Sequence, residues 1–221
     1  MNLGMNRRII SPSILSADFS NLKAVCELIN QSEAEWIHLD VMDGVFVNNI
    51  SFGFPVLEAV KKHCQKMMDV HIMIVHPENY VTRFAKAGAG MLTFHFEAAE
   101  NPQKVIDQIH EEGMKAGITI NPDVPVKALE PYLNQVDMVL LMSVFAGYGG
   151  QPFIEETYER MDELKKMMEL QKSTCLLEVD GGVNLENAPK LFAHGANVLV
   201  VGSSIFKAEN PLETIHQLKN C

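Results

Sequence analysis

The sequence predicts an α/β fold and, within that class, a (β/α)8 TIM barrel. A short β-rich run is followed by a segment with helical periodicity eight times in succession, and no linker or low-complexity stretch separates these pairs. Such alternation indicates parallel strands covered by helices. No GxGxxG motif follows the first strand, which disfavours an open dinucleotide-binding sheet. With right-handed crossovers, eight units of this length favour a closed barrel, so we expect residues 1–221 to form one barrel domain.

The eight pairs follow one another along the whole chain. Strands are expected within 8–15, 36–43, 68–75, 91–97, 116–121, 138–144, 175–181 and 198–206. Helices are expected within 18–31, 54–64, 79–88, 102–113, 126–134, 154–170, 185–195 and 211–220. Apolar and β-branched runs predict the strands, and apolar residues spaced three or four apart predict the helices.

Composition and charge narrow the classes of partner. Hydrophobic residues make up 47% of the chain and charged residues 21%, as in a globular protein with a sizeable core. The net charge of −10 argues against nucleic acid as a partner, although backbone dipoles can still hold small anions. No apolar run approaches 18 residues, so we expect no membrane contact.

The beginning of the chain and its cysteines indicate a compartment. The start MNLGMNRRII has too few apolar residues for a signal peptide. Cys26, Cys64, Cys175 and Cys221 are scattered, which is typical of reduced thiols. We therefore expect a cytoplasmic protein, and we expect it to form a homo-oligomer.

Polar residues interrupt the apolar strand IHLDVMDG, residues 37–44. Side chains alternate between the two faces of a strand, so Ile37, Leu39 and Val41 share one face. His38, Asp40 and Met42 share the other. In a barrel the first face packs on helices, and the second points into the barrel near its carboxyl-terminal rim, where polar groups are tolerated.

The same alternation occurs in two more strands. In DVHIMIV it places His71 and Met73 inside, and in CLLEVDGG it places Asp180 inside together with Glu178. His38, Asp40, His71 and Asp180 are therefore candidate metal ligands. Each alone is more often a core or rim residue, but two imidazoles and two carboxylates together suit one divalent ion such as Zn²⁺, Fe²⁺, Mn²⁺ or Co²⁺. Glu178 is an alternative ligand that we expect to lie deeper, and His95 with Glu97 form a second alternative pair.

One glycine-rich stretch follows the sixth predicted strand, and two more end the seventh and eighth. They are GYGGQ at 147–151, DGG at 180–182 and GSS at 202–204. The loops after strands seven and eight commonly form the phosphate site of this fold, and glycines let backbone N–H groups approach a phosphate closely. No Lys or Arg lies in these loops, so backbone groups would have to bind the anion.

These motifs resemble one known family. SPSILSADF, HLDVMDGVFV, DVHIMI, LMSV followed by GYGGQPF, EVDGGV and VGSSIF are similar to the ribulose-phosphate 3-epimerase family, in order, from about Ile10 to Phe206. The resemblance implies a barrel of the ribulose-phosphate-binding type and 3-epimerisation of a ketose phosphate, most simply D-ribulose 5-phosphate to D-xylulose 5-phosphate. This chemistry removes a proton from one face of the carbon next to a ketone and returns one to the other face. The small-molecule partner would be a sugar phosphate.

The resemblance also implies residue roles. One divalent metal ion would be held by His38, Asp40, His71 and Asp180, with Asp40 and Asp180 as the catalytic acid and base. The implied substrate-binding residues are Ser13, His71, Met42, Met73, Met142, Gly147, Tyr148, Gly149, Gly150, Gly181, Gly182, Gly202 and Ser203.

The chain departs from the family pattern at two rim loops. Ala146 and Asn48 stand where the family usually has prolines. Because proline fixes its own φ and restricts the preceding residue, we expect a more variable loop at 145–150, and we expect Ala146→Pro to lower KM.

Three other functions remain to be weighed. A D-allulose-6-phosphate 3-epimerase would use the same ligands and aspartates and differ only in the rim loops. A non-enzymatic sugar-phosphate-binding barrel would need the phosphate loops but not both aspartates. A decarboxylase or a Schiff-base aldolase would need a lysine that no predicted strand end supplies.

Overall fold

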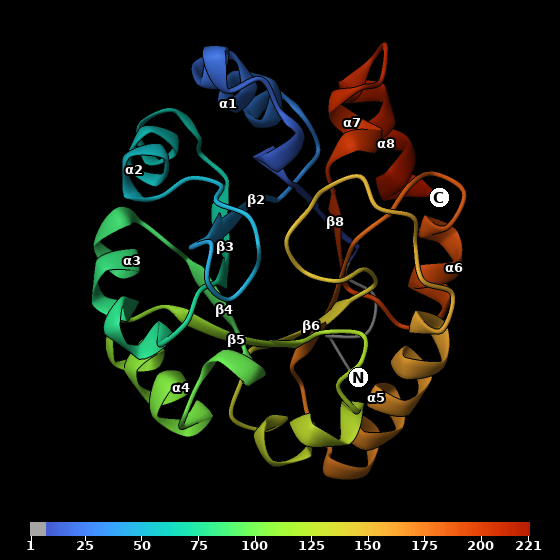
Figure 1. Cartoon of the computed structure of the whole chain (residues 1–221). Helices are drawn as coiled ribbons and strands as arrows, with labels where there is room; N and C mark the ends of the chain where they lie inside the picture. Colours follow the sequence, from blue (N-terminus) through green and yellow to red (C-terminus); the bar gives the residue numbers. More distant parts are fainter. Residues whose placement is uncertain (1–7) are drawn as a thin grey trace.

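The computed structural model describes residues 8–221, which form a barrel of eight parallel strands surrounded by helices (Figure 1). The strands hydrogen-bond in the order β1-β8-β7-β6-β5-β4-β3-β2. An isolated parallel bridge between Ser13 and His38 joins the segment after β1 to β2 and closes the ring. The strands are β1 (Ile9–Pro12), β2 (Trp36–Met42), β3 (Met67–Met73), β4 (Met91–His95), β5 (Lys115–Ile120), β6 (Met138–Met142), β7 (Leu176–Asp180) and β8 (Val198–Val201). The predicted (β/α)8 fold is confirmed.

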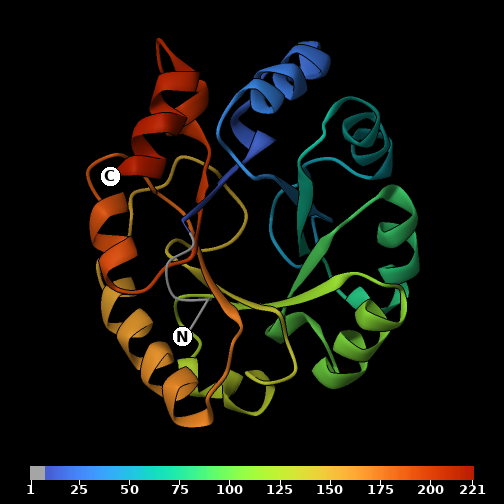
Figure 2. The ribbon, with the colours of Figure 1, turned by 180° about the vertical axis from the view of Figure 1, so that it is seen from behind.

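Helices cover the outside of the barrel, as views from opposite sides show (Figure 1 and Figure 2). They are α1 (Leu22–Gln31), α2 (Phe54–His63), α3 (Val81–Ala87), α4 (Pro102–Glu111), α5 (Thr157–Gln171), α6 (Ala188–Ala193), α7 (Ser203–Phe206) and α8 (Pro211–Asn220). Within residues 8–221, no helix combines the length and the apolar character needed to cross a membrane.

Local sequence explains where two of these helices begin. The side chain of Asn101 accepts a hydrogen bond from the amide of Lys104 at the start of α4, and Asn210 accepts one from Glu213 at the start of α8. A proline follows each asparagine at the first helical position. Asparagine satisfies an otherwise free amide there, and proline has no amide to leave unpaired.

Several predicted elements differ from the structure. The strands expected at 8–15 and 91–97 end at Pro12 and His95, and the 3-10 turns Ile14–Ser16 and Phe96–Ala98 follow them. The segment expected as an α-helix at 126–134 is a 3-10 helix, Val126–Tyr132, because Pro131 inside it cannot donate the hydrogen bond that an α-helical turn requires. The strand expected at 198–206 ends at Val201, and Ser203–Phe206 form the short helix α7.

The alternation expected for the strands is present. Ile37, Leu39 and Val41 of β2 are buried in the large apolar core that also contains helix residues. A separate apolar cluster that includes Trp36 and Met138 comes from positions at or near the first residues of the strands. The barrel interior is therefore apolar at its amino-terminal end, and polar residues lie nearer the carboxyl-terminal rim.

One interior position requires glycine for packing. Gly117 of β5 pairs with Thr93 of β4, and a Cβ on Gly117 would lie 2.1 Å from Thr93 Oγ1 and 2.9 Å from Thr93 Cβ. Thr93 is fully buried, so its side chain has no room to move away.

We expect Gly117→Ala to destabilise the barrel by about 1–3 kcal/mol, the range for overpacked cores. For a chain of this size the unfolding temperature should fall by about 2–12 °C. Gly53→Ala is the matched control, because no atom lies within 4 Å of its added Cβ. Thermal unfolding measured by circular dichroism checks this, and equal unfolding temperatures for the two variants would contradict it.

Candidate active site

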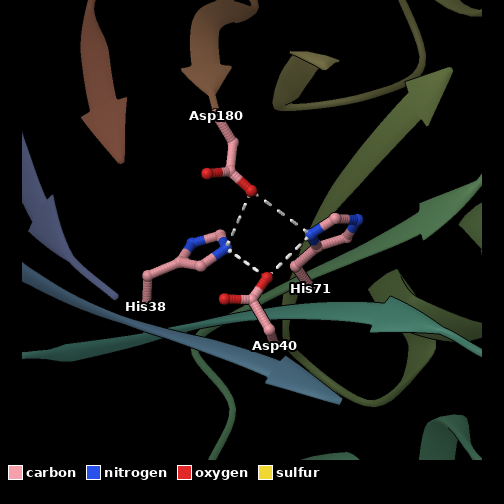
Figure 3. Close-up of side chains that lie close together, drawn as sticks. All are labelled: His38, Asp40, His71 and Asp180. Carbon is pink, nitrogen blue, oxygen red and sulfur yellow. Dashed lines mark hydrogen bonds and ion pairs between the residues drawn. The ribbon is translucent and has the colours of Figure 1, made fainter. Parts of the chain in front are cut away.

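Four side chains meet at the carboxyl-terminal end of the barrel (Figure 3). Asp40 Oδ1 lies 3.2 Å from His38 Nε2 and 3.1 Å from His71 Nδ1. Asp180 Oδ2 lies 3.9 Å from each of the same two nitrogens. The four atoms surround one point, and all lie within 4.8 Å of one another. These residues, which come from β2, β3 and β7, are the four ligands that the sequence predicted, and they form a group that could hold a metal ion.

A buried carboxylate orients His38. Asp69 Oδ2 lies 2.7 Å from His38 Nδ1 and accepts a second hydrogen bond from Ser11 Oγ at 3.0 Å. All three side chains are fully buried. With Nδ1–H donating to Asp69, Nε2 is the nitrogen that faces Asp40 and Asp180.

A second histidine orients His71. The Nε2 atoms of His71 and His95 are 3.0 Å apart, so one must donate and the other accept. Burial lowers the pKa of His95 to about 4, which keeps its ring neutral and able to accept. His71 then donates through Nε2 and presents Nδ1 to Asp40. His95, an alternative ligand in the sequence analysis, is therefore an orienting group outside the set of four, and Glu97 Oε2 lies 3.6 Å from its other nitrogen.

The other alternative ligand, Glu178, lies as deep as expected. It is fully buried and belongs to a second group with His38 and Asp69. Both of its carboxylate oxygens and Asp69 Oδ1 lack a hydrogen-bond partner among the described residues. Burial raises the pKa of Glu178 well above its ordinary value, and the charge of Asp69 adds to the shift.

The two aspartates of the cluster have opposite electrostatic environments. Burial raises the pKa of Asp180 to about 7, and the negative charge of Asp40 contributes to the shift. Burial would also raise the pKa of Asp40, but His38 and His71 outweigh it and hold that pKa below its ordinary value. Ser13 Oγ donates to Asp40 Oδ2 at 2.6 Å. The pair can therefore present one carboxylate and one carboxylic acid near neutral pH, the division that acid–base catalysis uses.

A cavity opens above the cluster and gathers most of the residues that the sequence analysis singled out. Its predicted lining residues are Ser13, Asp40, Met42, Met73, Met142, Gly147, Tyr148, Gly149, Gly150, Asp180, Gly181, Gly182, Gly202 and Ser203. His38 and His71 are fully buried and absent from this lining. Lining residues to which the sequence analysis gave no role include Leu15, Ser16 and Val200.

The loop after β6 is less free than the sequence suggested. The amide of Ala146 donates to Asn121 Oδ1 at 3.0 Å. A proline at 146 would have no N–H and would remove this bond, so the position does not accept proline without loss. This bond removes the premise on which Ala146→Pro was expected to lower KM, namely a site that accepts proline without a lost contact.

The fold and the site define the protein as a TIM barrel with a candidate metal centre beneath a rim cavity. Residues 9–206 match the sequence model of the ribulose-phosphate 3 epimerase family. The chain belongs to the ribulose-phosphate 3-epimerase family, which consists of isomerases of the racemase and epimerase class.

Curated relatives agree over nearly full length. The ribulose-phosphate 3-epimerase of Bacillus subtilis is 43% identical over 211 residues, which cover 95% of this chain and 97% of the relative. The Synechocystis protein of the same name is 42% identical, with 96% and 93% covered. The Schizosaccharomyces pombe protein of the same name is 38% identical, with 96% and 92% covered.

Solved structures share the fold at low sequence identity. The tryptophan synthase A-subunit of Pyrococcus furiosus gives a TM-score of 0.70 at 16% identity, covering 97% of this chain and 98% of that one. KGPDC from Streptococcus mutans gives 0.72 at 12% identity, covering 97% of each chain. At such low identity, these structural similarities establish the barrel fold and nothing about function.

We expect Asp69→Ala to weaken metal binding by about 10- to 100-fold, because the orientation of the His38 ring depends on this carboxylate. Asp69→Asn keeps an acceptor oxygen, so its affinity for Zn²⁺ should lie between that of Asp69→Ala and that of the wild type. A chelator-competition titration with Zn²⁺ measures the affinity.

His38→Ala serves as the reference for a lost ligand in this titration. Asp162→Ala is the matched control, because Asp162 pairs with His194 at 2.9 Å on the surface, away from the cluster. If Asp69→Ala binds Zn²⁺ as tightly as Asp162→Ala does, Asp69 does not position a metal ligand.

Proposed function

We propose that the protein catalyses the 3-epimerisation of D-ribulose 5-phosphate to D-xylulose 5-phosphate. The observation that carries this proposal is the placement of Asp40 and Asp180 on opposite sides of one point, with His38 and His71 between them (Figure 3). Epimerisation needs a proton acceptor on one face of the reacting carbon and a proton donor on the other. Membership of the ribulose-phosphate 3-epimerase family supports the choice of reaction.

The two aspartates would exchange their roles with the direction of the reaction. A carboxylate on one face removes the proton from C3, and the carboxylic acid on the other face returns a proton to the same carbon. After one turnover the first aspartate is protonated and the second is not, which is the arrangement that the reverse reaction requires. Ser13 donates to the outer oxygen of Asp40, so that its other oxygen stays directed at the cluster.

The donor set fits one divalent metal ion. His38 Nε2, His71 Nδ1, Asp40 Oδ1 and Asp180 Oδ2 would hold it, and donors bound at 2.0–2.2 Å around a tetrahedral ion stand about 3.3–3.6 Å apart. The cross-cluster separations of 3.1–3.9 Å bracket this value. Two imidazoles and two carboxylates suit Zn²⁺, Fe²⁺, Mn²⁺ or Co²⁺. When bound, such an ion would polarise the ketone and stabilise the negative charge that develops on its oxygen.

Backbone amides would bind the phosphate group. Three glycine-containing stretches, 147–150, 181–182 and 202–203, line the cavity together. None of the described residues that line the cavity is a Lys or an Arg. The phosphate charge would therefore be met by backbone N–H groups, which glycines allow to approach closely.

The remaining lining residues would shape the sugar site. Met42, Met73 and Met142 are almost fully buried, and their thioethers form a polarisable wall without strong hydrogen-bonding groups. Ser13 lines the cavity and would contact the substrate from the side of the cluster, whereas His71 does not line the cavity and would act as a metal ligand. The homo-oligomeric state and the cytoplasmic location stay predictions.

D-Allulose 6-phosphate is the alternative substrate, because the same aspartates would epimerise it. Phe145 is half exposed and lines the cavity, so its ring narrows the space beside the sugar and favours the shorter pentulose. We expect the catalytic efficiency for D-ribulose 5-phosphate to exceed that for D-allulose 6-phosphate when both are assayed side by side. A higher efficiency with the hexulose phosphate would reverse the assignment, and no turnover of either would refute the proposed function.

We expect Asp40→Asn and Asp180→Asn each to lower turnover by at least about 100-fold, since acid–base groups contribute 10²–10⁴. A variant that lacks only the proton donor should still exchange the C3 hydrogen with solvent from one face. Formation of D-xylulose 5-phosphate and deuterium uptake from D₂O, both followed by NMR, distinguish the two steps. Asp162→Asn is the control, and near-normal epimerisation by Asp180→Asn would remove Asp180 from catalysis.

A further inference from the structure

Two rim loops from opposite sides of the barrel meet above its mouth. One loop, residues 43–53, follows β2, and the other, residues 143–156, follows β6. In the ring of eight strands β2 and β6 are four positions apart in either direction. Figure 1 shows the two loops side by side over the centre of the barrel. Hydrogen bonds between the two loops connect opposite sides of the barrel mouth.

Two side-chain hydrogen bonds join the loops. The Tyr148 hydroxyl donates to the carbonyl oxygen of Asn48, and Asn49 Nδ2 donates to the carbonyl oxygen of Gly147 at 2.7 Å. Gly147 also lies against the side chain of Val47, because a Cβ on Gly147 would lie 3.2 Å from Val47 Cβ. Gly147 has φ of +125°, a conformation that favours glycine.

The loop after β2 is a firm support for these bonds. Asp43 accepts hydrogen bonds from the amides of Val45 and Phe46 and, through its second oxygen, from Val75 of the neighbouring loop. Ser51 donates to the carbonyl oxygen of Asp40 and accepts from the amide of Met42. This loop is therefore attached to β2 and to the segment after β3 without any help from the loop after β6.

The loop after β6 is held at its base and joined to the opposite loop only at its tip. Ala146 is anchored to Asn121, and Gln151 Nε2 donates to the carbonyl oxygens of Phe145 and Tyr148 at 2.8 Å each. The tip, Gly147 and Tyr148, also bonds across the mouth, through the Gly147 carbonyl and the Tyr148 hydroxyl. Three glycines within four residues would otherwise leave the tip many conformations.

We propose that the Tyr148 hydroxyl and the Asn49 carboxamide form a latch that fixes the glycine run 147–150 over the cavity. Tyr148 is then a positioning residue for the phosphate group of the substrate, rather than a direct ligand of it. Its hydroxyl proton is already donated to Asn48, and its ring is half exposed. This inference rests on the proposed function for the identity of the anion, and on the two hydrogen bonds for the latch itself.

The latch predicts an effect on binding that is confined to the phosphate. Tyr148→Phe removes one hydroxyl and leaves the ring, so we expect the Kd for inorganic phosphate to rise about two- to tenfold, the range of one net hydrogen bond. KM for D-ribulose 5-phosphate should rise by the same factor while kcat changes little, because the phosphate contact is equal in ground and transition states. The loss of catalytic efficiency with D-ribulose 5-phosphate should exceed any loss with unphosphorylated D-ribulose.

The matched control is Tyr80→Phe. Tyr80 is also a partly exposed rim tyrosine, and its hydroxyl makes no hydrogen bond within residues 8–221. Asn49→Ala should raise the Kd for inorganic phosphate in the same way as Tyr148→Phe. In the double variant the fold-increase of the phosphate Kd should be smaller than the product of the two single increases. The reason is that one lost bond already frees the tip that both bonds hold.

Calorimetric titration with inorganic phosphate tests the latch even if the enzyme assay fails. A wild type that binds phosphate but does not epimerise D-ribulose 5-phosphate would refute the proposed function and leave the latch standing. A phosphate Kd for Tyr148→Phe equal to that of Tyr80→Phe would overturn the latch. Fully independent effects of Tyr148→Phe and Asn49→Ala, or an equal loss with unphosphorylated D-ribulose, would overturn it as well.

Discussion

Two carboxylates and two imidazoles meet around one point, with their facing atoms within 4.8 Å of one another, inside a barrel whose amino-terminal end and outer face are apolar. Burying such groups is unfavourable unless each one is paired. Burial lowers the pKa of His38, yet the charges of Asp40 and Asp69 outweigh it and raise that pKa well above its ordinary value. The point between the four side chains therefore favours a positive charge, whether a proton or a metal ion. The rest of the barrel is arranged around this requirement.

The interior changes in character from one end of the barrel to the other. Apolar side chains such as Trp36 and Met138 fill the amino-terminal end. Above them Asp69 and Glu178 form a buried polar layer, and Asp69 orients His38. The cluster lies next, and the cavity opens above it. Each of these layers packs on the layer beneath it. The reacting groups are therefore positioned by rigid strands, and the loops above them only have to bind the ligand.

The strand alternation made the core of the site predictable, and through-space contacts account for what was missed. A period of two places His38, Asp40, His71 and Asp180 on inward faces, and parallel strands bring those faces to one rim. Asp69 has the same parity as His71 two residues later, so the sequence held a signal for it. The contact of His71 with His95 depends on the register between β3 and β4, which no local pattern specifies. The bond from the Ala146 amide to Asn121 joins loops 25 residues apart, so nothing in the local sequence indicates that a proline there would lose a hydrogen bond.

The charge of the molecule and the charge of the proposed ligand have the same sign. The chain carries −10, and two of its carboxylates, Asp40 and Asp180, lie directly beneath the cavity. A phosphate group is therefore best placed away from Asp40 and Asp180, on the side formed by the glycine stretches after β6, β7 and β8. There its charge meets backbone N–H groups, which attract an anion only when they are held in a fixed direction. A chain that uses glycines in place of cationic side chains must fix the backbone by other means, and hydrogen bonds between neighbouring loops supply that order.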